Sequence, residues 1–296
     1  MPQTKNTSAL VRLTSAVLLF GTIGLFRTWS GLPSGLLSMT RGLIGAAFLY
    51  AVMLLTGKHI SFSAIQKSLP LLILSGAMIG ANWILLFEAY NYTTVPIATL
   101  CYYMAPVFVI LASPLVLKEK LTGTRLLCTG IALVGIILVV FGSDDGASDG
   151  KNHLIGILCG LGAAALYGGD ILINKVVEGV TAEERTFVQL FTAGLVCIPY
   201  TFLCEDLGSV EWTGAGIALM LVMGIVHTGI AYTLYFGSMK QLPAQTVALL
   251  SYIDPVASVI LAVWLIPGSI LSAAGWVGSV LVLGAALASE LPHKEK

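Results

Sequence analysis

Two apolar stretches decide the fold: VPIATLCYYMAPVFVILASPLVL at residues 95–117 and PAQTVALLSYIDPVASVILAVWLI at residues 243–266. Each is long enough to cross the hydrocarbon core of a bilayer, which takes about 20 residues of α-helix. Each also carries tyrosine near its middle, closely followed by a proline, Pro106 in the first stretch and Pro255 in the second. This correspondence between distant stretches predicts a membrane protein with two related halves.

The composition of the whole chain agrees with that class. Of its 296 residues, 57% are hydrophobic and 10% are charged, whereas a soluble domain is about 45–50% apolar and about 25% charged. This excludes a water-soluble enzyme. Fifteen Lys and Arg residues balance fifteen Asp and Glu residues, so the chain lacks the basic surface that nucleic-acid binding requires. We therefore expect an all-α polytopic membrane protein that has the lipid bilayer as a partner and no nucleic acid.

Ten transmembrane helices are predicted from the apolar runs, and their orientation follows from the basic residues, which collect in cytoplasmic loops. With the amino terminus inside, twelve Lys and Arg residues fall on the inner side and only Lys151 falls outside. We therefore expect both termini in the cytoplasm and the chain in the cell (inner or plasma) membrane. The predicted spans are 9–28, 35–56, 68–88, 95–117, 123–142, 153–174, 186–204, 213–236, 243–266 and 270–289.

The two halves are expected to be inverted copies. Leu19-Phe20-Gly21 in the first span resembles Leu166-Tyr167-Gly168 in the sixth. Because each half has five spans, an odd number, the second copy must enter the membrane in the opposite orientation, which is the architecture of many secondary transporters. The predicted organisation is a first five-helix repeat at 1–142, an acidic outer linker at 143–152 and a second, inverted repeat at 153–296, arranged around a central cavity.

With these features the sequence resembles the EamA-type members of the drug/metabolite transporter superfamily over its whole length. The resemblance implies that spans 1 to 4 and 6 to 9 surround the substrate cavity, that spans 5 and 10 pack outside it, and that the protein moves small metabolites, often outward. One departure is Gly268, which stands where a counterpart of Glu119 is expected after span 9. The residues that carry the resemblance are Arg41, the elements at 19–21 and 166–168, Pro106, Pro255 and the turn Lys118-Glu119-Lys120-Leu121-Thr122.

Five charged residues lie inside predicted spans, where an unpaired charge costs at least about 2.5–3.5 kcal/mol and marks a candidate functional site. Arg27 and Glu88 fall at span ends, where we expect an interfacial or ion-pairing role. Arg41 lies deeper and within expected reach of Glu88, so an Arg–carboxylate pair and binding of a substrate carboxylate both stay open. Asp170 and Asp254 are the two deep acids.

Both deep acids lie on polar helical stripes. Asp170 shares a face with Tyr167 and Asn174, and Asp254 shares one with Ser251 and Ser258. We expect these faces to line the cavity, Asp254 as the deepest charge, either binding a substrate ammonium or carrying a coupling proton. The structural alternative is a protonated acid that is hydrogen-bonded to a neighbouring helix.

Aromatic and amide side chains complete the candidate site, because tyrosine both stacks and forms hydrogen bonds. Adjacent helical residues point about 100° apart, so only one of Tyr102 and Tyr103 is expected to face fully inward. A proline pair near mid-span is interpreted as a hinge, with static curvature as the alternative. The candidate substrate-binding residues are Asp254, Tyr102, Tyr103, Ser251, Tyr252, Asp170, Tyr167, Arg41, Asn82, Trp83 and Tyr232, and the candidate hinge residues are Pro106 and Pro255.

The predicted function is a secondary transporter that exports a small metabolite, an amino acid or a similar zwitterion, by alternating access. A passive channel or facilitator for small polar solutes is the alternative, and an intramembrane aspartyl protease using Asp170 and Asp254 is a remote one. The sequence carries no ATP-binding motif, and its five scattered cysteines suggest neither a metal site nor disulfides. We expect no enzyme activity, no cofactor, a small-molecule substrate and a monomer, with a homodimer left open.

Overall fold

The computed structural model describes residues 2–57, 61–92, 98, 101–141, 153–265 and 272–289, which contain helices and no strand. One of these elements, η2, is a π-helix, and another, η1, is a single 3-10 turn. The elements in chain order are α1 (Pro2–Ser30), α2 (Ser34–Leu55), α3 (Phe62–Tyr92), α5 (Ala105–Val116), α6 (Gly123–Phe141), α7 (His153–Val176), α8 (Ala182–Cys204), η1 (Leu207–Ser209), α9 (Gly214–Val222), η2 (Met223–Ile230), α10 (Ala231–Met239), α11 (Ala244–Leu250), α12 (Ile253–Leu265) and α13 (Ala273–Ser289).

Six continuous helical segments of the described chain are long and apolar enough to cross a membrane. They correspond to predicted spans 1, 2, 3, 6, 7 and 8. The helices of predicted spans 5 and 10, α6 and α13, are apolar but shorter over their described residues. Predicted spans 4 and 9 are interrupted, so neither forms one continuous helix. The all-helical membrane fold is therefore confirmed, and the interruptions are its main departure from the sequence expectation.

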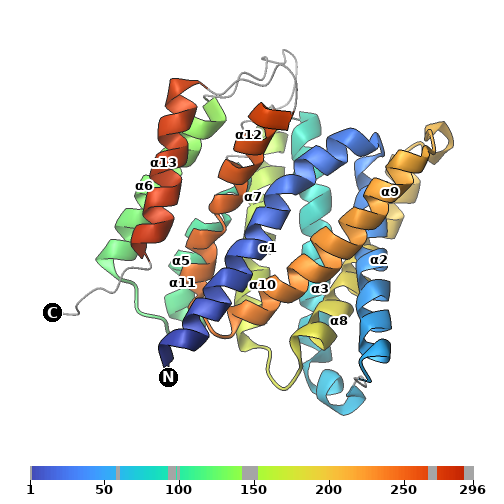
Figure 1. Cartoon of the computed structure of the whole chain (residues 1–296), viewed down its shortest axis with the longest axis horizontal. Helices are drawn as coiled ribbons and strands as arrows, with labels where there is room; N and C mark the ends of the chain where they lie inside the picture. Colours follow the sequence, from blue (N-terminus) through green and yellow to red (C-terminus); the bar gives the residue numbers. More distant parts are fainter. Residues whose placement is uncertain are drawn as a thin grey trace.

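The helices form an up-and-down bundle (Figure 1). We define the N-terminal face as the end of the bundle where α1 begins and α2 ends; α10 ends and α11 begins at the same end (Figure 1). Helices α6 and α13 pack mainly on each other, at one edge of the bundle (Figure 1). Helix α3 packs on α7 and α8, α2 packs on α8 and η2, and α1 packs on α10 and α12.

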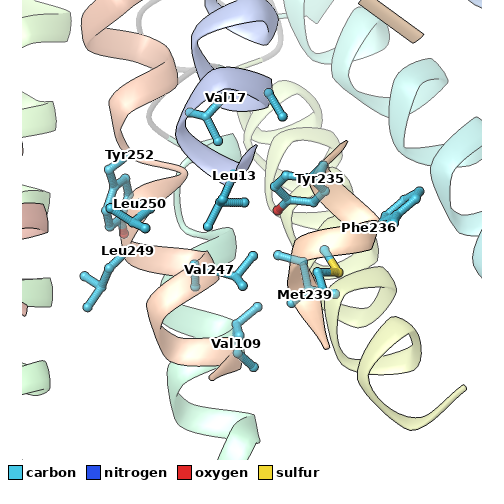
Figure 2. Close-up of a cluster of buried hydrophobic side chains, with 14 of the residues drawn as sticks. Leu13, Val17, Val109, Tyr235, Phe236, Met239, Val247, Leu249, Leu250 and Tyr252 are labelled. Atoms are coloured by element: carbon cyan, nitrogen blue, oxygen red, sulfur yellow. The ribbon is translucent and has the colours of Figure 1, made fainter. Parts of the chain in front are cut away.

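A large apolar cluster fills the bundle between α1, α10 and α11. Figure 2 shows Leu13 and Val17 of α1 beside Val247 of α11, with Tyr235 and Met239 of α10 on the other side. These five side chains are at most 1% exposed. Because lipid supplies no hydrophobic drive between helices, this contact is stabilised by close packing of the side chains. The cluster therefore places α1 between α11 and α10 (Figure 2).

The two prolines do not lie in the middle of bent helices, which corrects the sequence expectation. Tyr103 and Met104 form a turn, and Pro106 is the second residue of the new helix α5. Ser251 and Tyr252 form the second turn, and Pro255 is the third residue of α12. A proline in the first helical turn costs no hydrogen bond, because its missing N–H would have no partner there. Both spans are thus broken just before the proline.

Two glycines allow a whole helix to approach each break closely. A Cβ atom on Gly21 of α1 would lie 2.9 Å from Cβ of Ala257 and 3.0 Å from the carbonyl oxygen of Asp254. A Cβ atom on Gly168 of α7 would lie 3.4 Å from the carbonyl oxygen of Ala105. Asp254 and Ala105 each directly precede the proline of their span. Gly21 and Gly168 therefore contact matching positions of the two broken spans. The contact of α1 is tighter than that of α7.

Candidate functional site

A group of tyrosines lies between the two breaks. The ring of Tyr102, the last helical residue before the first break, stacks on Tyr167 of α7 with 5.8 Å between centroids and 12° between planes. The Tyr167 hydroxyl lies 2.8 Å from the hydroxyl of Tyr235 in α10. Tyr167 also donates to Oγ of Ser251 at 3.4 Å, and Ser251 belongs to the second break. These contacts connect the first break to the second through α7 and α10.

A second aromatic layer adjoins these tyrosines. Tyr232 lies one helical turn before Tyr235, and its ring contacts Phe20 of α1 at 5.0 Å and Trp83 of α3 at 6.3 Å between centroids. Phe20 also contacts Tyr235 at 5.6 Å. Aromatic pairs at these separations attract one another beyond their burial of area. We call the set Phe20, Trp83, Tyr102, Tyr167, Tyr232, Tyr235 and Ser251 the central cluster.

Arg41 of α2 lies at one side of the central cluster. Its side chain is 7% exposed, and its guanidinium carbon lies 4.4 Å from the centroid of the Trp83 ring. The Nε donates to Oγ1 of Thr228 at 3.1 Å. Within the described part of the chain, no carboxylate pairs with Arg41 and no acceptor binds its two terminal nitrogens. A desolvated guanidinium has five N–H donors, so four of them remain free for a bound anion.

Of the two roles left open for Arg41, the ion pair with Glu88 is not formed among the described residues. Glu88 accepts a hydrogen bond from the hydroxyl of Tyr200 at 2.8 Å instead. The two residues lie on different helices, and their depths along the sequence could not reveal that Arg41 points toward Trp83 and η2. Arg27 is exposed at the end of α1, where it donates to Oγ of Ser34 at 2.7 Å and lies over Phe87.

Asp254 is the second residue of α12, directly after the second break. Its side chain is half-buried, and no described residue forms a hydrogen bond or an ion pair with its carboxylate. Its backbone carbonyl lies against Gly21 of α1, the residue after Phe20 of the central cluster. An acid and a base without an opposite charge as partner among the described residues therefore lie beside the central cluster.

Asp170 occupies a different environment, although it shares a helical stripe with Tyr167. Its Oδ1 accepts hydrogen bonds from Ser75 of α3 and, at 2.9 Å, from Nδ2 of Asn174. Gln189 of α8 donates to Ser75 and, at 3.0 Å, to Oδ1 of Asn174. These four side chains are at most 2% exposed. Asp170 is thus tied into a polar network between α3, α7 and α8, while Tyr167 faces α10 and α11.

The remaining predicted residues are divided between the cluster and its surroundings. Asn82 is 3% exposed and donates to the carbonyl oxygen of Ala163 at 2.6 Å, beside the Tyr102 side chain. Tyr103 is half-buried, and its ring packs against that of Tyr102. Tyr252 is fully buried on the side of the second break away from Tyr235 (Figure 2), and its hydroxyl has no hydrogen-bond partner among the described residues.

Two polar residues of the π-helical segment η2 escaped the sequence analysis as site residues. Thr228 binds Arg41 and donates to the carbonyl oxygen of Met223 at 2.8 Å, five residues earlier, as the wider π-helical turn allows. The sequence analysis did not include His227 in the site. Its Nε2 lies 2.6 Å from Oγ1 of Thr22. Short π-helices occur frequently at functional sites. A threonine in an apolar run was the only sequence signal for this contact.

The described residues do not support the aspartyl protease alternative. Such an enzyme needs two carboxyl groups that share a proton, but Asp170 bonds to Ser75 and Asn174 and makes no hydrogen bond to Asp254. The described residues also contain no group of three or more His, Cys, Asp or Glu residues that is able to hold a metal ion. The polar and aromatic centre of this helical membrane bundle therefore defines a class, the polytopic membrane proteins that bind a ligand between their helices.

Comparisons with known proteins agree with this class and narrow it. A sequence model of the EamA-like transporter family matches residues 7–141 and 154–289, so the chain belongs to the EamA-like transporter family. A crystal structure of another protein has the same fold, with a TM-score of 0.84 and 22% identity over 96% of this chain and 97% of that chain. The protein is thus a membrane transporter of small solutes.

Three relatives illustrate the range of the family. The uncharacterized transporters YxxF and YwfM of Bacillus subtilis are each 26% identical to this chain, over 87% and 85% of it and over 81% and 82% of their own lengths. A protein of Rhizobium johnstonii named riboflavin transporter is 28% identical over 82% of this chain and 77% of its own length.

Proposed function

We propose that this protein is a secondary transporter that exports an amino acid or a similar zwitterion across the cell membrane by alternating access, with a single chain as the transport unit. One observation carries the proposal: Arg41 over the ring of Trp83 and Asp254 beside Gly21 both lie next to the central cluster, and neither has an opposite charge as partner among the described residues. An unpaired intramembrane charge is costly and marks a ligand pathway.

The two charges suit the two ends of a zwitterion. The free terminal nitrogens of Arg41 match a substrate carboxylate, which guanidinium binds through two parallel hydrogen bonds. The Asp254 carboxylate matches a substrate ammonium. Tyr102 and Tyr232 of the central cluster supply aromatic faces for the rest of the molecule and hydroxyls for hydrogen bonds. Asp170 is the second acid of the proposal, with a role in proton transfer or in holding α3, α7 and α8 together.

The arrangement of the helices supports an inverted repeat and alternating access. Contacts of α3 with α7 are matched by contacts of α1 with α10, and those of α7 with α5 by those of α1 with α12. The close approaches of Gly21 and Gly168 match as well. Broken helices at a central site are a recurrent feature of transporters with inverted repeats. We propose that the breaks before Pro106 and Pro255 act as the hinges.

The basic residues support an orientation with the N-terminal face in the cytoplasm. Glu178 lies exposed at this face, between α7 and α8, and Glu211 lies exposed at the opposite face, between α8 and α9. In a cysteine-free background, an impermeant thiol reagent outside intact cells should label Glu211→Cys and not Glu178→Cys. Labelling of Glu178→Cys alone would reverse the proposed orientation.

Ligand binding to the purified protein tests the substrate class. Because a ligand that binds only the folded state stabilises it by about 2.7 kcal/mol at 100 times its Kd, a thermal-shift screen should find amino acids that raise the melting temperature. The matching amides, which lack the carboxylate, and the matching carboxylic acids, which lack the ammonium, should each give smaller shifts. Proteoliposomes loaded with the stabilising amino acid should then exchange it by counterflow.

Two variants test the roles of the two charges separately. Arg41→Gln should lose the preference for the amino acid over its amide, and Asp254→Asn should lose the preference over the carboxylic acid. Riboflavin, nucleosides and sugars serve as competing classes in the same screen. Stabilisation by one of these and by no amino acid would refute the proposed substrate class. Non-saturable flux without counterflow would favour the channel or facilitator instead.

A further inference from the structure

The half of the second broken span at the N-terminal face is a short helix that supplies no cap for itself. All seven residues of α11 are buried, and the residue before it, Pro243, makes no side-chain capping hydrogen bond. The first N–H groups of a helix need acceptors, and burial makes their absence costly. Glu119, from the connection between α5 and α6, provides them: Oε1 accepts from the amide of Ala244 at 2.8 Å and Oε2 from that of Gln245 at 3.5 Å.

The side chain of Gln245 reinforces this contact. It is fully buried, its Nε2 donates to Oγ of Ser113 at 2.7 Å, and its Oε1 accepts from Nη1 of Arg125 at 2.7 Å. Ser113 lies in the last turn of α5, and Arg125 lies in the first turn of α6. Three consecutive parts of the chain, the end of α5, the connection and the start of α6, therefore hold the first turn of α11.

The backbone of the connection is shaped for this contact. Lys118, directly before Glu119, has a φ of 56°, the only positive φ of a non-glycine residue in the described chain. Lysine seldom adopts this left-handed conformation, because its Cβ atom crowds the backbone. On the other side of α11, Nζ of Lys175 donates to the carbonyl oxygens of Met239 and Leu242, which lead into α11 from α10.

The far end of α11 is the second break, beside Asp254. A seven-residue helix that ends in a turn is able to move as a rigid piece, because the turn absorbs the change in backbone angles. The sequence aligns Gly268 with Glu119, and glycine has no carboxylate for such a contact; Gly268 itself lies outside the described residues.

We propose that Glu119 and Gln245 form a latch that closes the N-terminal face and must open in every transport cycle, so that the resting protein is closed to that face. This inference rests on the proposed transport function. Glu119 is a positioning residue in this scheme, since it acts on α11 and not on the substrate. The alternative is a permanent strut that stabilises the fold and never opens.

Cysteine accessibility tests the latch without any substrate. Val247 of α11 is fully buried and faces Leu13 of α1 (Figure 2), so in a cysteine-free background Val247→Cys reports movement of α11 away from α1. Reagent added to the N-terminal face should label Val247→Cys slowly. Adding Glu119→Ala should raise the labelling rate on the order of tenfold, because hydrogen bonds to a charged group stabilise the closed state by about that factor. An unchanged rate would overturn the latch.

Glu205 provides the matched control. It caps α2 in the same way, accepting from the amides of Gly35 at 2.6 Å and Leu36 at 2.9 Å, but it joins two unbroken helices at the opposite face. Glu205→Ala removes the same kind of contact and should not raise labelling of Val247→Cys from the N-terminal face. An equal rise in both variants would indicate general loosening of the bundle and would overturn the specific role of Glu119.

A cross-link tests the latch even if Glu119→Ala folds poorly. Glu119→Cys and Ala244→Cys together should be joined by a short bifunctional thiol reagent that a reductant can cleave. Counterflow of a radiolabelled mixture of the protein amino acids should stop on cross-linking and return after reduction. Undiminished counterflow in the cross-linked protein would show a permanent strut and overturn the latch, whereas absence of counterflow in the unmodified protein would refute the amino acid proposal instead.

Discussion

The two broken spans share a backbone design and differ in what their side chains present. At the first break the turn closes with the amide of Met104 donating to the carbonyl oxygen of Cys101 at 3.1 Å, and Tyr102 and Tyr103 are half-buried. At the second, the amide of Asp254 donates to Ser251 at 3.2 Å. Ser251 and Tyr252 are buried there, and the carboxylate of Asp254 stands where the first break has Ala105.

This difference teaches how two similar breaks in the backbone present different side chains. A turn followed by proline in the first helical turn satisfies the backbone at both breaks. The side chains at matching positions are then free to diverge, so that the first break contributes aromatic surface and the second contributes charge. The following predictions test the comparison, from the largest expected effect to the smallest.

Removing the charge at the second break should have the largest effect. Asp254→Asn keeps the shape and hydrogen-bonding capacity of the side chain, and it should lower the affinity for zwitterions at least about tenfold, the effect of losing one charge-assisted hydrogen bond. Binding measured by thermal shift and uptake in proteoliposomes check this. If Asp254 carries a coupling proton instead, counterflow should survive while pH-driven uptake disappears.

Asp170→Asn is the matched control for that variant. Because Asp170 is held by Ser75 and Asn174, its replacement should alter stability more than zwitterion preference. Wild-type transport and pH dependence in Asp254→Asn, together with loss of both in Asp170→Asn, would move the functional acid from the second break to α7.

Replacing Gly21 and Gly168 by alanine should have different effects on the stability of the protein. Gly21→Ala places a methyl group 2.9 Å from Cβ of Ala257 and 3.0 Å from a backbone oxygen, so overpacking should cost about 1–3 kcal/mol. Gly168→Ala meets only ordinary contacts at 3.4 Å or more and gains helix propensity worth up to about 1 kcal/mol. In detergent, the melting temperature of Gly168→Ala should therefore be higher than that of Gly21→Ala. Equal melting temperatures would contradict the difference in packing.

Replacing the prolines should slow interconversion more than it weakens binding. Alanine restores an N–H and favours a continuous helix across each break, so Pro106→Ala and Pro255→Ala should each reduce the transport rate severalfold with ligand affinity nearly unchanged. Time courses of uptake and parallel thermal shifts separate the two quantities. Unchanged rates in both variants would mean that the breaks shape the site without acting as hinges.

The smallest expected effect concerns two buried hydroxyls. Tyr235 bonds to Tyr167 and Ser251, so Tyr235→Phe should destabilise the protein by about 0.5–1.5 kcal/mol. The hydroxyl of Tyr252 has no partner, so Tyr252→Phe should be neutral or slightly stabilising. Melting temperatures of the two variants test this, and a marked loss in Tyr252→Phe would show that its hydroxyl is engaged by a ligand or water.

The sequence by itself determined the class of protein and much of the list of components. Its apolar runs, set by the thickness of the bilayer, predicted the helical membrane fold, and its matching elements around Gly21, Gly168, Pro106 and Pro255 pointed to the segments that contain the two breaks and the glycines packed against them. Membrane helices must satisfy their backbone internally, so length and hydropathy suffice to predict where they run. The rarity of charge in such runs equally singled out Arg41, Asp170 and Asp254.

Only the tertiary structure decided which components meet. Helical periodicity gives the direction of a side chain relative to its own helix and not the identity of the neighbouring helix. It placed Asp170 on one face with Tyr167, and depth in the membrane left open a pair of Arg41 with Glu88, whereas packing directs Asp170 to Ser75 and Arg41 to Trp83 and Thr228. The contacts of Arg41 with Thr228 and of Glu119 with α11 join residues more than 100 positions apart, because hydrogen bonds between helices are selected by the packing of the whole bundle.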